Sequence, residues 1–233
     1  MVSGHQSPII SQSRTMPTDA IITLTDPRSA AAEAYRTLRT NLEFASVDER
    51  LQTLLVTSAA PTDGKSAAVA NLAVAMADGD RPVILVDADL RRPAQHTLFG
   101  LSNDKGFTNL FRDDEAFNQP PFQAVPNTSL QVLTSGPLPP IPSQLLASNK
   151  MAEIMAHLAG MADIIIFDAP PIITVNDASL LASKVDGVLL VVKAGGTKRD
   201  HVKAAKDRLE KVNARLIGAV LTYAQVDATL QYV

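Results

Sequence analysis

The residues with the clearest chemical potential are Gly64, Lys65 and Ser66. This order is typical of a phosphate-binding loop: backbone N–H groups cradle phosphates, the lysine reaches the terminal phosphates, and the serine ligates Mg²⁺. The complete pattern has another glycine five positions before the lysine-preceding one, where this sequence has Ala59. Since GKS alone is common by chance, the competing interpretation is an ordinary turn between a strand and a helix.

Three carboxylates follow apolar runs elsewhere in the chain. Asp87 and Asp89 end the run that starts at Pro82, and Asp168 ends the run that starts at Asp163. Side chains alternate along a strand, so Asp87 and Asp89 point to the same face, at the end of the strand where open α/β sheets bind ligands. A Mg²⁺·nucleotide would balance such a pair, and Asp168 fits the Walker B pattern. An aspartate that only caps a turn would explain one of these carboxylates but not the set.

The elements that must position these groups alternate between strand and helix. Thr53 to Ser58 predicts a buried strand, and the alanine-rich stretch from Ala67 to Ala77 predicts the helix after the loop. The same pattern continues to Leu221 and predicts an α/β fold, with a mostly parallel, twisted sheet and helices on both faces. Further strands are expected at 82–89, 130–133, 163–168, 187–192 and 215–221, and helices at 143–159, 176–184 and 199–212.

Composition limits the class of protein. The chain has 233 residues and is 46% hydrophobic, which is enough for one sizeable core. It contains no cysteine, which is consistent with a reducing compartment. Its formal net charge of −3 gives no basic field for nucleic acid, so we expect no nucleic-acid partner. The longest apolar runs are strand-sized and shorter than the roughly 20 residues of a membrane-spanning helix.

Three regions are expected along the chain. Residues 1–25 are read as a flexible arm, 26–223 as one domain and 224–233 as a tail. A helix from about Arg28 to Ala45 has an apolar stripe and a polar side with Glu33, Arg36 and Arg39. From composition alone, that polar side favours a solvated surface over a subunit contact.

The motifs together resemble a known family. LVTSAAPTDGKS, VILVDADLRRP and IIIFDAPP are similar to the Walker A, A′ and B motifs of the bacterial tyrosine kinases of capsular and exopolysaccharide synthesis. These kinases belong to the P-loop branch of the cell-division and plasmid-partition ATPases. The segments EAYRTLRTNLEF, HTLFGLSNDKGFTNLF and SGPLPPIPSQLL also occur in the family's order, and the resemblance runs from about Pro27 to Leu221.

The resemblance implies an ATP- and Mg²⁺-dependent transfer of phosphate to tyrosine. Lys65 would contact the phosphates, Asp89 would accept the proton of the attacking hydroxyl, and Asp87 would support the metal region. The metal ligands would be Ser66, Asp87 and Asp168. The expected nucleotide-binding residues are Thr62, Asp63, Gly64, Lys65, Ser66, Ala67 and Arg91.

The resemblance also implies an assembly. Glu33, Arg36 and Arg39 match the family's ExxRxxR element, which joins subunits into a ring, and this reverses the preference for a solvated helix. The family acts with a membrane-embedded activator. We therefore expect a separate activator, a cytoplasmic location at the inner face of the plasma membrane, and tyrosines of proteins as substrates.

Some positions depart from the family pattern. Thr62 fills a slot that usually holds glycine, so either the turn keeps a negative φ or the loop has another shape. Ala67 replaces a threonine. The usual tyrosine-rich tail is reduced to Tyr223, expected to pack near the last strand, and Tyr232, the more accessible acceptor.

Two other functions stay open. A partition-type switch ATPase would carry an extra lysine early in the loop, where this chain has Ala59 and Ala60. A catalytically weak scaffold of polysaccharide assembly is consistent with Thr62, Ala67 and the few tyrosines.

Overall fold

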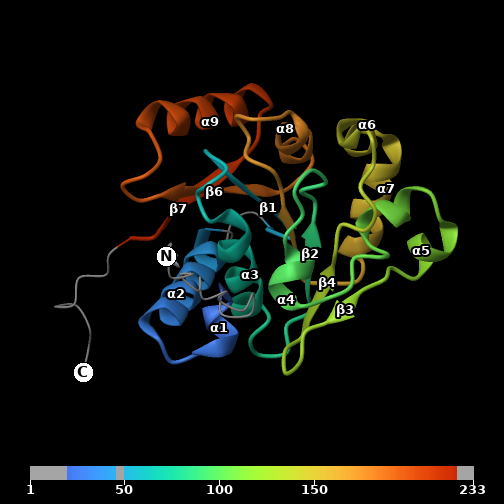
Figure 1. Cartoon of the computed structure of the whole chain (residues 1–233), viewed down its shortest axis with the longest axis horizontal. Coiled ribbons are helices and arrows are strands. Elements are labelled where there is room, and N and C mark those ends of the chain that lie inside the picture. Colours follow the sequence, from blue (N-terminus) through green and yellow to red (C-terminus); the bar gives the residue numbers. More distant parts are fainter. Residues whose placement is uncertain (1–19, 46–49, 225–233) are drawn as a thin grey trace, which may run out of the picture.

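A seven-stranded sheet forms the centre of the computed structural model, which describes residues 20–45 and 50–224 (Figure 1). The strand order is β3-β4-β2-β5-β1-β6-β7, and all neighbours are parallel except the short edge pair β3 and β4. The predicted fold class is confirmed. The strands are β1 (Thr53–Ser58), β2 (Val83–Asp87), β3 (Gln123–Ala124), β4 (Leu130–Leu133), β5 (Ile164–Asp168), β6 (Gly187–Lys193) and β7 (Leu216–Thr222).

Helices cover both faces of this sheet (Figure 1). Alternate residues of the central strands enter two separate apolar clusters, as the two-residue period of a strand requires. One face packs α1 (Ile22–Thr25), α2 (Ala30–Ala45) and α3 (Lys65–Met76), and the other packs α7 (Asn149–Ala159), α8 (Asp177–Ala182) and α9 (Arg199–Lys211). Shorter helical elements complete the fold: α4 (Gln95–Phe99), the 3₁₀ helix Phe107–Phe111, α5 (Asp114–Asn118) and α6 (Pro142–Ala147).

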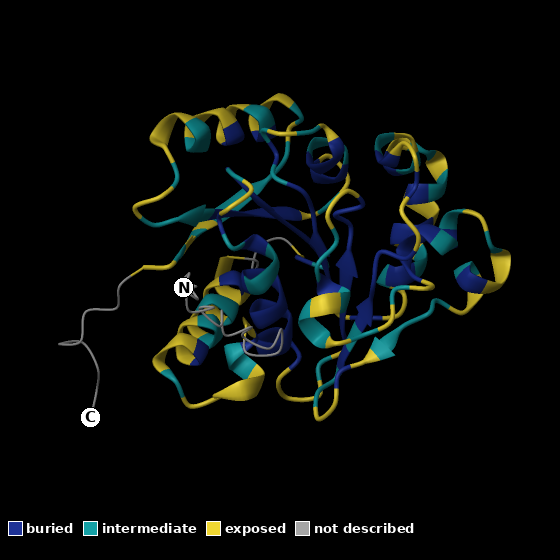
Figure 2. Ribbon diagram, viewed as in Figure 1, coloured by how far each residue is buried: buried dark blue, intermediate teal, exposed yellow. Residues whose placement is uncertain are grey.

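Burial falls from the sheet outward, as Figure 2 shows. The strands β1, β2 and β5 are buried along their full length, and α3 is buried on nearly all sides because it lies between the sheet and α1 and α2. The helices α2 and α9 bury only one stripe each. The loop before α3 is therefore attached to the least mobile part of the fold.

The region before α2 packs against α3. Ile21 is 1% exposed, and the Thr23 backbone N–H donates to Asn71 Oδ1 of α3 at 3.0 Å. Asn71 Nδ2 in turn donates to the Ala20 carbonyl at 2.9 Å. The last residues of the predicted arm, 20–25, thus pack on the domain, because α3 supplies both an apolar surface and an amide that bonds to their backbone. The rest of the predicted arm, 1–19, and the tail beyond Ala224 lie outside the described residues.

Several element boundaries also differ from the predictions. The expected helix 143–159 is two helices, because Ser148 adopts an extended conformation (ψ 159°) between α6 and α7. The helix α2 starts at Ala30, since the Ser29 hydroxyl accepts the Ala32 N–H and caps it there. None of the described helices is long and apolar enough to cross a bilayer.

Candidate active site

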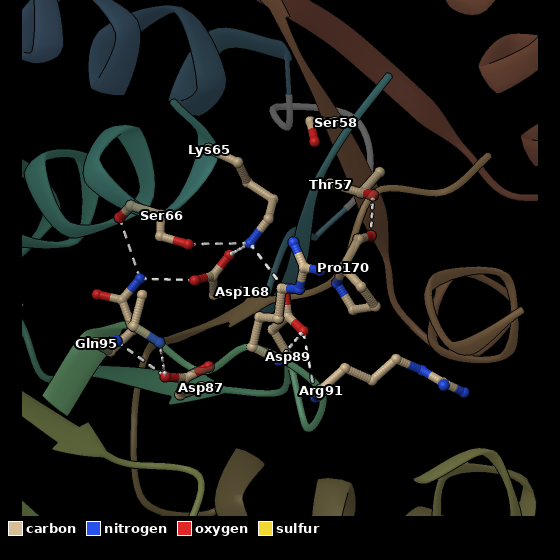
Figure 3. A network of polar contacts seen from close by, with 12 residues as sticks. Thr57, Ser58, Lys65, Ser66, Asp87, Asp89, Arg91, Gln95, Asp168 and Pro170 are labelled. Atoms are coloured by element: carbon tan, nitrogen blue, oxygen red, sulfur yellow. Dashed lines mark hydrogen bonds and ion pairs between the residues drawn. The ribbon is translucent and has the colours of Figure 1, made fainter. Parts of the chain in front are cut away.

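Three neighbouring strands bring the predicted site residues together. The order β2-β5-β1 places the ends of these strands side by side, with Asp87 in register with Asp168, and Asp168 in register with Val56. The loop between β1 and α3 lies above this edge and presents Lys65 (Figure 3). The predicted convergence of the phosphate-binding loop with two strand-end carboxylates is therefore found in the structure.

Lys65 is the centre of the cluster. Its Nζ contacts the Asp168 carboxylate, donates to Ser66 Oγ at 3.1 Å and lies 3.8 Å from Asp89 Oδ2 (Figure 3). The lysine is 7% exposed, and Asp168 is fully buried. This ammonium compensates two carboxylates that would be costly to bury alone.

Asp87 is buried and only partly hydrogen-bonded. Its Oδ2 accepts the N–H groups of Ala94 and Gln95, both at 2.9 Å, whereas its Oδ1 has no partner among the described residues. Burial, together with the neighbouring Asp168 carboxylate, raises the pKa of Asp87 to about 7. A buried carboxylate oxygen without a donor is a favourable ligand for a cation.

Asp89 lies beside the lysine at the start of the next loop. It accepts the backbone N–H groups of Arg91 at 3.3 Å and Arg92 at 3.0 Å. Burial raises the pKa of Asp89 despite the opposing effect of Lys65. A raised pKa suits a carboxylate that takes up a proton during a reaction.

The donor atoms fit Mg²⁺. Ser66, Asp87 and Asp168 offer only oxygen ligands, and Asp87 Oδ1 is an unpaired acceptor at this place. Within the described chain, no group of three or more acidic or histidine side chains is arranged to hold a metal by itself. Proteins hold Mg²⁺ through one or two carboxylates together with waters and substrate phosphates, and the oxygen donors here are of that kind.

The phosphate-binding loop has a backbone shape that requires Gly64. This residue has φ 72°, and a Cβ there would come 2.9 Å from the Tyr223 ring. The Ala67 carbonyl accepts a hydrogen bond from Asn71 Nδ2 within α3.

Asp63 and Arg91, both predicted to bind nucleotide, have partners within the chain. The Asp63 carboxylate accepts the Ala60 N–H at 2.7 Å and the Thr197 hydroxyl at 2.6 Å, so it shapes the loop from inside the protein. Arg91 forms a two-point ion pair with Asp177 (2.7 and 3.2 Å), and its side chain extends away from Lys65 (Figure 3). That hydrogen-bonded pair raises the pKa of Arg91.

The predicted oligomerisation residues divide into two groups. Glu33 and Arg36 form an ion pair on the surface of α2. Arg39 instead donates to the Ala75 carbonyl at 2.9 Å and approaches Asp78 at 3.4 Å, and so ties α2 to the end of α3. Arg39 therefore has a role within the chain that the sequence pattern does not reveal.

The two predicted phosphoacceptors also differ in what the structure describes. Tyr223 directly follows β7 but is 68% exposed, with its ring against Gly64 and under Lys193 Nζ at 4.9 Å. Tyr223 thus lies next to the last strand, as expected, but most of its side chain is exposed. Tyr232 lies outside the described residues.

Sequence reasoning missed Gln95, Thr197 and Asp177. Gln95 is fully buried and contacts both Ser66 and Asp168, Thr197 anchors Asp63, and Asp177 holds Arg91. The only available signal for Gln95 was its place in the loop after Asp89, which does not distinguish it from its neighbours.

Comparisons with known proteins agree with this geometry. Residues 50–228 match the family model ParA, described as NUBPL iron-transfer P-loop NTPase. Tyrosine-protein kinase YwqD of Bacillus subtilis is 41% identical over 91% of this chain and 89% of its own length. Putative tyrosine-protein kinase CapB of Staphylococcus aureus is 36% identical, over 88% of this chain and 90% of its own.

Solved structures give the same result. The chimerical protein CapA2B2 superposes with a TM-score of 0.82 at 36% identity, covering 87% of this chain and 89% of that one. The kinase domain of the Escherichia coli tyrosine kinase ETK gives 0.81 at 31% identity, covering 91% and 84%. The cell-division ATPase MinD of Pyrococcus furiosus, at 23% identity and a TM-score of 0.63, shares the fold. The chain belongs to the family of bacterial tyrosine-protein kinases, built on the ParA-type P-loop NTPase fold.

Proposed function

We propose that this chain is an ATP-dependent protein-tyrosine kinase that phosphorylates its own tyrosines and serves capsular or exopolysaccharide synthesis. One observation carries the proposal: Lys65 lies between the phosphate-binding loop and two buried carboxylates, Asp89 in the loop after β2 and Asp168 at the end of β5. The relatives named as tyrosine-protein kinases support the choice of tyrosine as acceptor.

The chain's own residues have separate tasks in this reaction. Lys65 exchanges its contact with Asp168 for the phosphates of ATP, because several phosphate oxygens offer it more negative charge than one carboxylate. Asp89, with its raised pKa, takes the proton from the tyrosine hydroxyl as its oxygen attacks the γ-phosphorus of ATP; the bond from that phosphorus to the β-phosphate breaks and ADP leaves. Ser66, Asp87 and Asp168 would hold Mg²⁺, which when bound neutralises charge on the phosphate oxygens.

The test is the intact mass of the purified chain after incubation with Mg·ATP, with site mapping and with ADP release followed in the same sample. Added phosphate on Tyr232 or Tyr223, absent in Lys65→Met, is the expected result. Steady ADP release without added phosphate would instead identify a switch ATPase, the function that the MinD-like fold keeps open. If neither appears, the assay is repeated with the cytoplasmic segment of the activator, and continued inactivity would contradict the kinase.

We further propose a homo-oligomeric ring and a membrane-embedded activator that recruits this cytoplasmic chain to the inner face of the plasma membrane. The position of the Glu33–Arg36 pair on the surface of α2 supports the ring, because a neighbouring subunit can reach both side chains there; within the chain Arg36 contacts Glu33 and the Pro27 carbonyl. The comparison structure CapA2B2 is a chimerical protein, which supports a partner.

The ring is tested by light scattering on the Mg·ATP-free chain with and without the activator segment. Arg36→Ala is expected to reduce the mass of the assembly and to leave the free energy of unfolding nearly unchanged, since its contacts with Glu33 and the Pro27 carbonyl are both on the surface. Arg39→Ala serves as the comparison, because it also removes the bond to α3 and should lower stability. An unchanged mass in Arg36→Ala would contradict its role in the ring.

A further inference from the structure

Gln95 is a buried amide that touches the three parts of the site. Its Nε2 donates to Asp168 Oδ2 at 2.7 Å and to the Ser66 carbonyl at 3.1 Å, and its backbone N–H donates to Asp87 Oδ2 at 2.9 Å. It is fully buried at the start of α4. Figure 3 shows it on the side of Asp168 opposite Asp89, below Ser66.

The chemistry of its partners requires an amide at this position. A carbonyl oxygen and a carboxylate oxygen both only accept, so the group between them must donate twice, and a neutral NH₂ does this without adding charge. Glutamate would place another acceptor against Asp168. The amide oxygen, by contrast, has no partner among the described residues, so the nitrogen's two bonds are what orient the side chain.

These bonds restrain the metal-facing carboxylate. Asp168 is held by Lys65 on one oxygen and by Gln95 on the other. Lys65 must leave when phosphates bind, as the proposed reaction requires, whereas the Gln95 bond does not compete with a phosphate. After that exchange Gln95 is the side chain that keeps Asp168 at a fixed position relative to Ser66.

We propose that Gln95 is a positioning residue: it fixes the Asp168 carboxylate against the Ser66 backbone, and thereby sets how tightly the site takes Mg²⁺ with nucleotide. The inference rests on the proposed function for its use of Mg·ATP. Partners that orient metal-ligating groups typically change metal affinity by about 10- to 100-fold when removed.

The chain contains a matched control in Gln52. Its Nε2 also donates to two acceptors, the carbonyls of Ala159 at 2.7 Å and Ala162 at 3.1 Å. It precedes β1, at the opposite end of the strand from the site. Replacing either glutamine by methionine keeps the length of the side chain and removes both bonds, so the two variants lose the same number of hydrogen bonds.

The experiment titrates Mg²⁺ into the full chain with a fluorescent ADP analogue and records the half-saturating Mg²⁺ concentration. In Gln95→Met this concentration is expected to rise about 10- to 100-fold, with the metal-free affinity for the analogue unchanged. Phosphoryl transfer by this variant should recover at saturating Mg²⁺. Gln52→Met should bind Mg²⁺ like the unmodified chain, although its urea midpoint falls.

Equal half-saturating concentrations in Gln95→Met and the unmodified chain would overturn the inference. So would a weaker metal-free affinity in Gln95→Met, because that would show general damage to the loop. The titration needs no phosphoryl transfer. A chain that binds Mg²⁺ with the analogue but never phosphorylates tyrosine would therefore refute the kinase and leave the role of Gln95 decided by the titration.

Discussion

The two ends of the central strands use carboxylates in opposite ways. At the start of β1, the exposed Asp186 accepts three hydrogen bonds on one oxygen, from the Gln52 and Thr53 N–H groups and the Thr53 hydroxyl (2.9, 2.7 and 2.8 Å). At the other end of the sheet, Asp87 is fully buried and keeps one oxygen without a partner. In both carboxylates the hydrogen bonds gather on one oxygen, but Asp186 is exposed, so water can reach its other oxygen, whereas the unpartnered oxygen of Asp87 is buried.

The difference separates a structural end from a chemical end. Asp186 ties the start of β1 to the segment before β6, and water can complete its hydrogen bonds. Unsatisfied buried carboxylates cost stability, and their presence at one edge is typical of a site whose missing partner is a ligand. Four predictions, in order of decreasing effect, test this contrast.

The largest effect is expected from Lys65→Met. It removes the cation that balances Asp89 and Asp168 and that reaches the phosphates, so phosphoryl transfer should fall about 10³-fold or more. Phosphotyrosine formation, measured by intact mass, checks this. Lys150→Met is the control, because Lys150 pairs with Glu153 on the surface of α7. Comparable activity in both variants would contradict the role of Lys65.

Asp89→Asn should lower phosphoryl transfer by about 10² to 10⁴-fold, the range for losing a general base. Asparagine retains an acceptor for the Arg91 and Arg92 N–H groups, so the loop should stay folded and nucleotide should still bind. Fluorescence binding of an ADP analogue, run beside the transfer assay, separates these effects. Loss of binding in parallel with transfer would show that Asp89 has a structural role instead.

The third prediction concerns pH. Asp87 has a pKa of about 7 in the folded chain against 3.8 for an ordinary aspartate, so between these values only the folded state holds the proton. Its contribution therefore makes the metal-free free energy of unfolding fall as pH rises through this window, by up to about 1.4 kcal/mol per pH unit.

Asp87→Asn removes that titration, and its stability should decline less between about pH 4 and about pH 7. Urea unfolding of both chains in a chelating buffer gives the comparison. Parallel pH dependences would show that Asp87 does not carry the unfavourable charge.

The smallest effect is expected at the structural end. Asp186→Ala removes three hydrogen bonds that water can partly replace, so the free energy of unfolding should fall by about 1 to 2 kcal/mol. Phosphoryl transfer per folded molecule should not change. A loss of transfer larger than the loss of folded protein would break the contrast between the two ends.

Most of the fold could be predicted because its signals are local. The strand Thr53–Ser58 matches its prediction residue for residue, and the strand ending at Asp168 differs by one residue at its start. Apolar runs that end in aspartate were enough to bring Asp87, Asp89 and Asp168 to one edge, because parallel strands align their ends. The short edge strand β3 and the packing of Ile21 were missed, since neither has a periodic pattern.

The orientation of side chains in the loops could not be predicted. Arg91 turns to Asp177, 86 residues away, and Asp63 turns to Thr197, 134 residues away. No pattern within a motif indicates such partners, because they depend on which loops the topology places together. The sequence therefore indicated which residues lie near the site, but not which direction the side chains in the loops take or which partners they contact.

The order β2-β5-β1 at the centre of the sheet has a consequence for how the site can work. Hydrogen bonds to β1 and β2 hold β5 on both sides, and apolar clusters cover both faces of the sheet. The ends of the three strands therefore keep fixed positions relative to one another. Adjustment to a ligand must then come from the segments that follow β1 and β2, residues 59–64 and 88–94, and from the Lys65 side chain. In this fold the edge of the sheet stays fixed, and only these short segments and the Lys65 side chain move to fit a ligand.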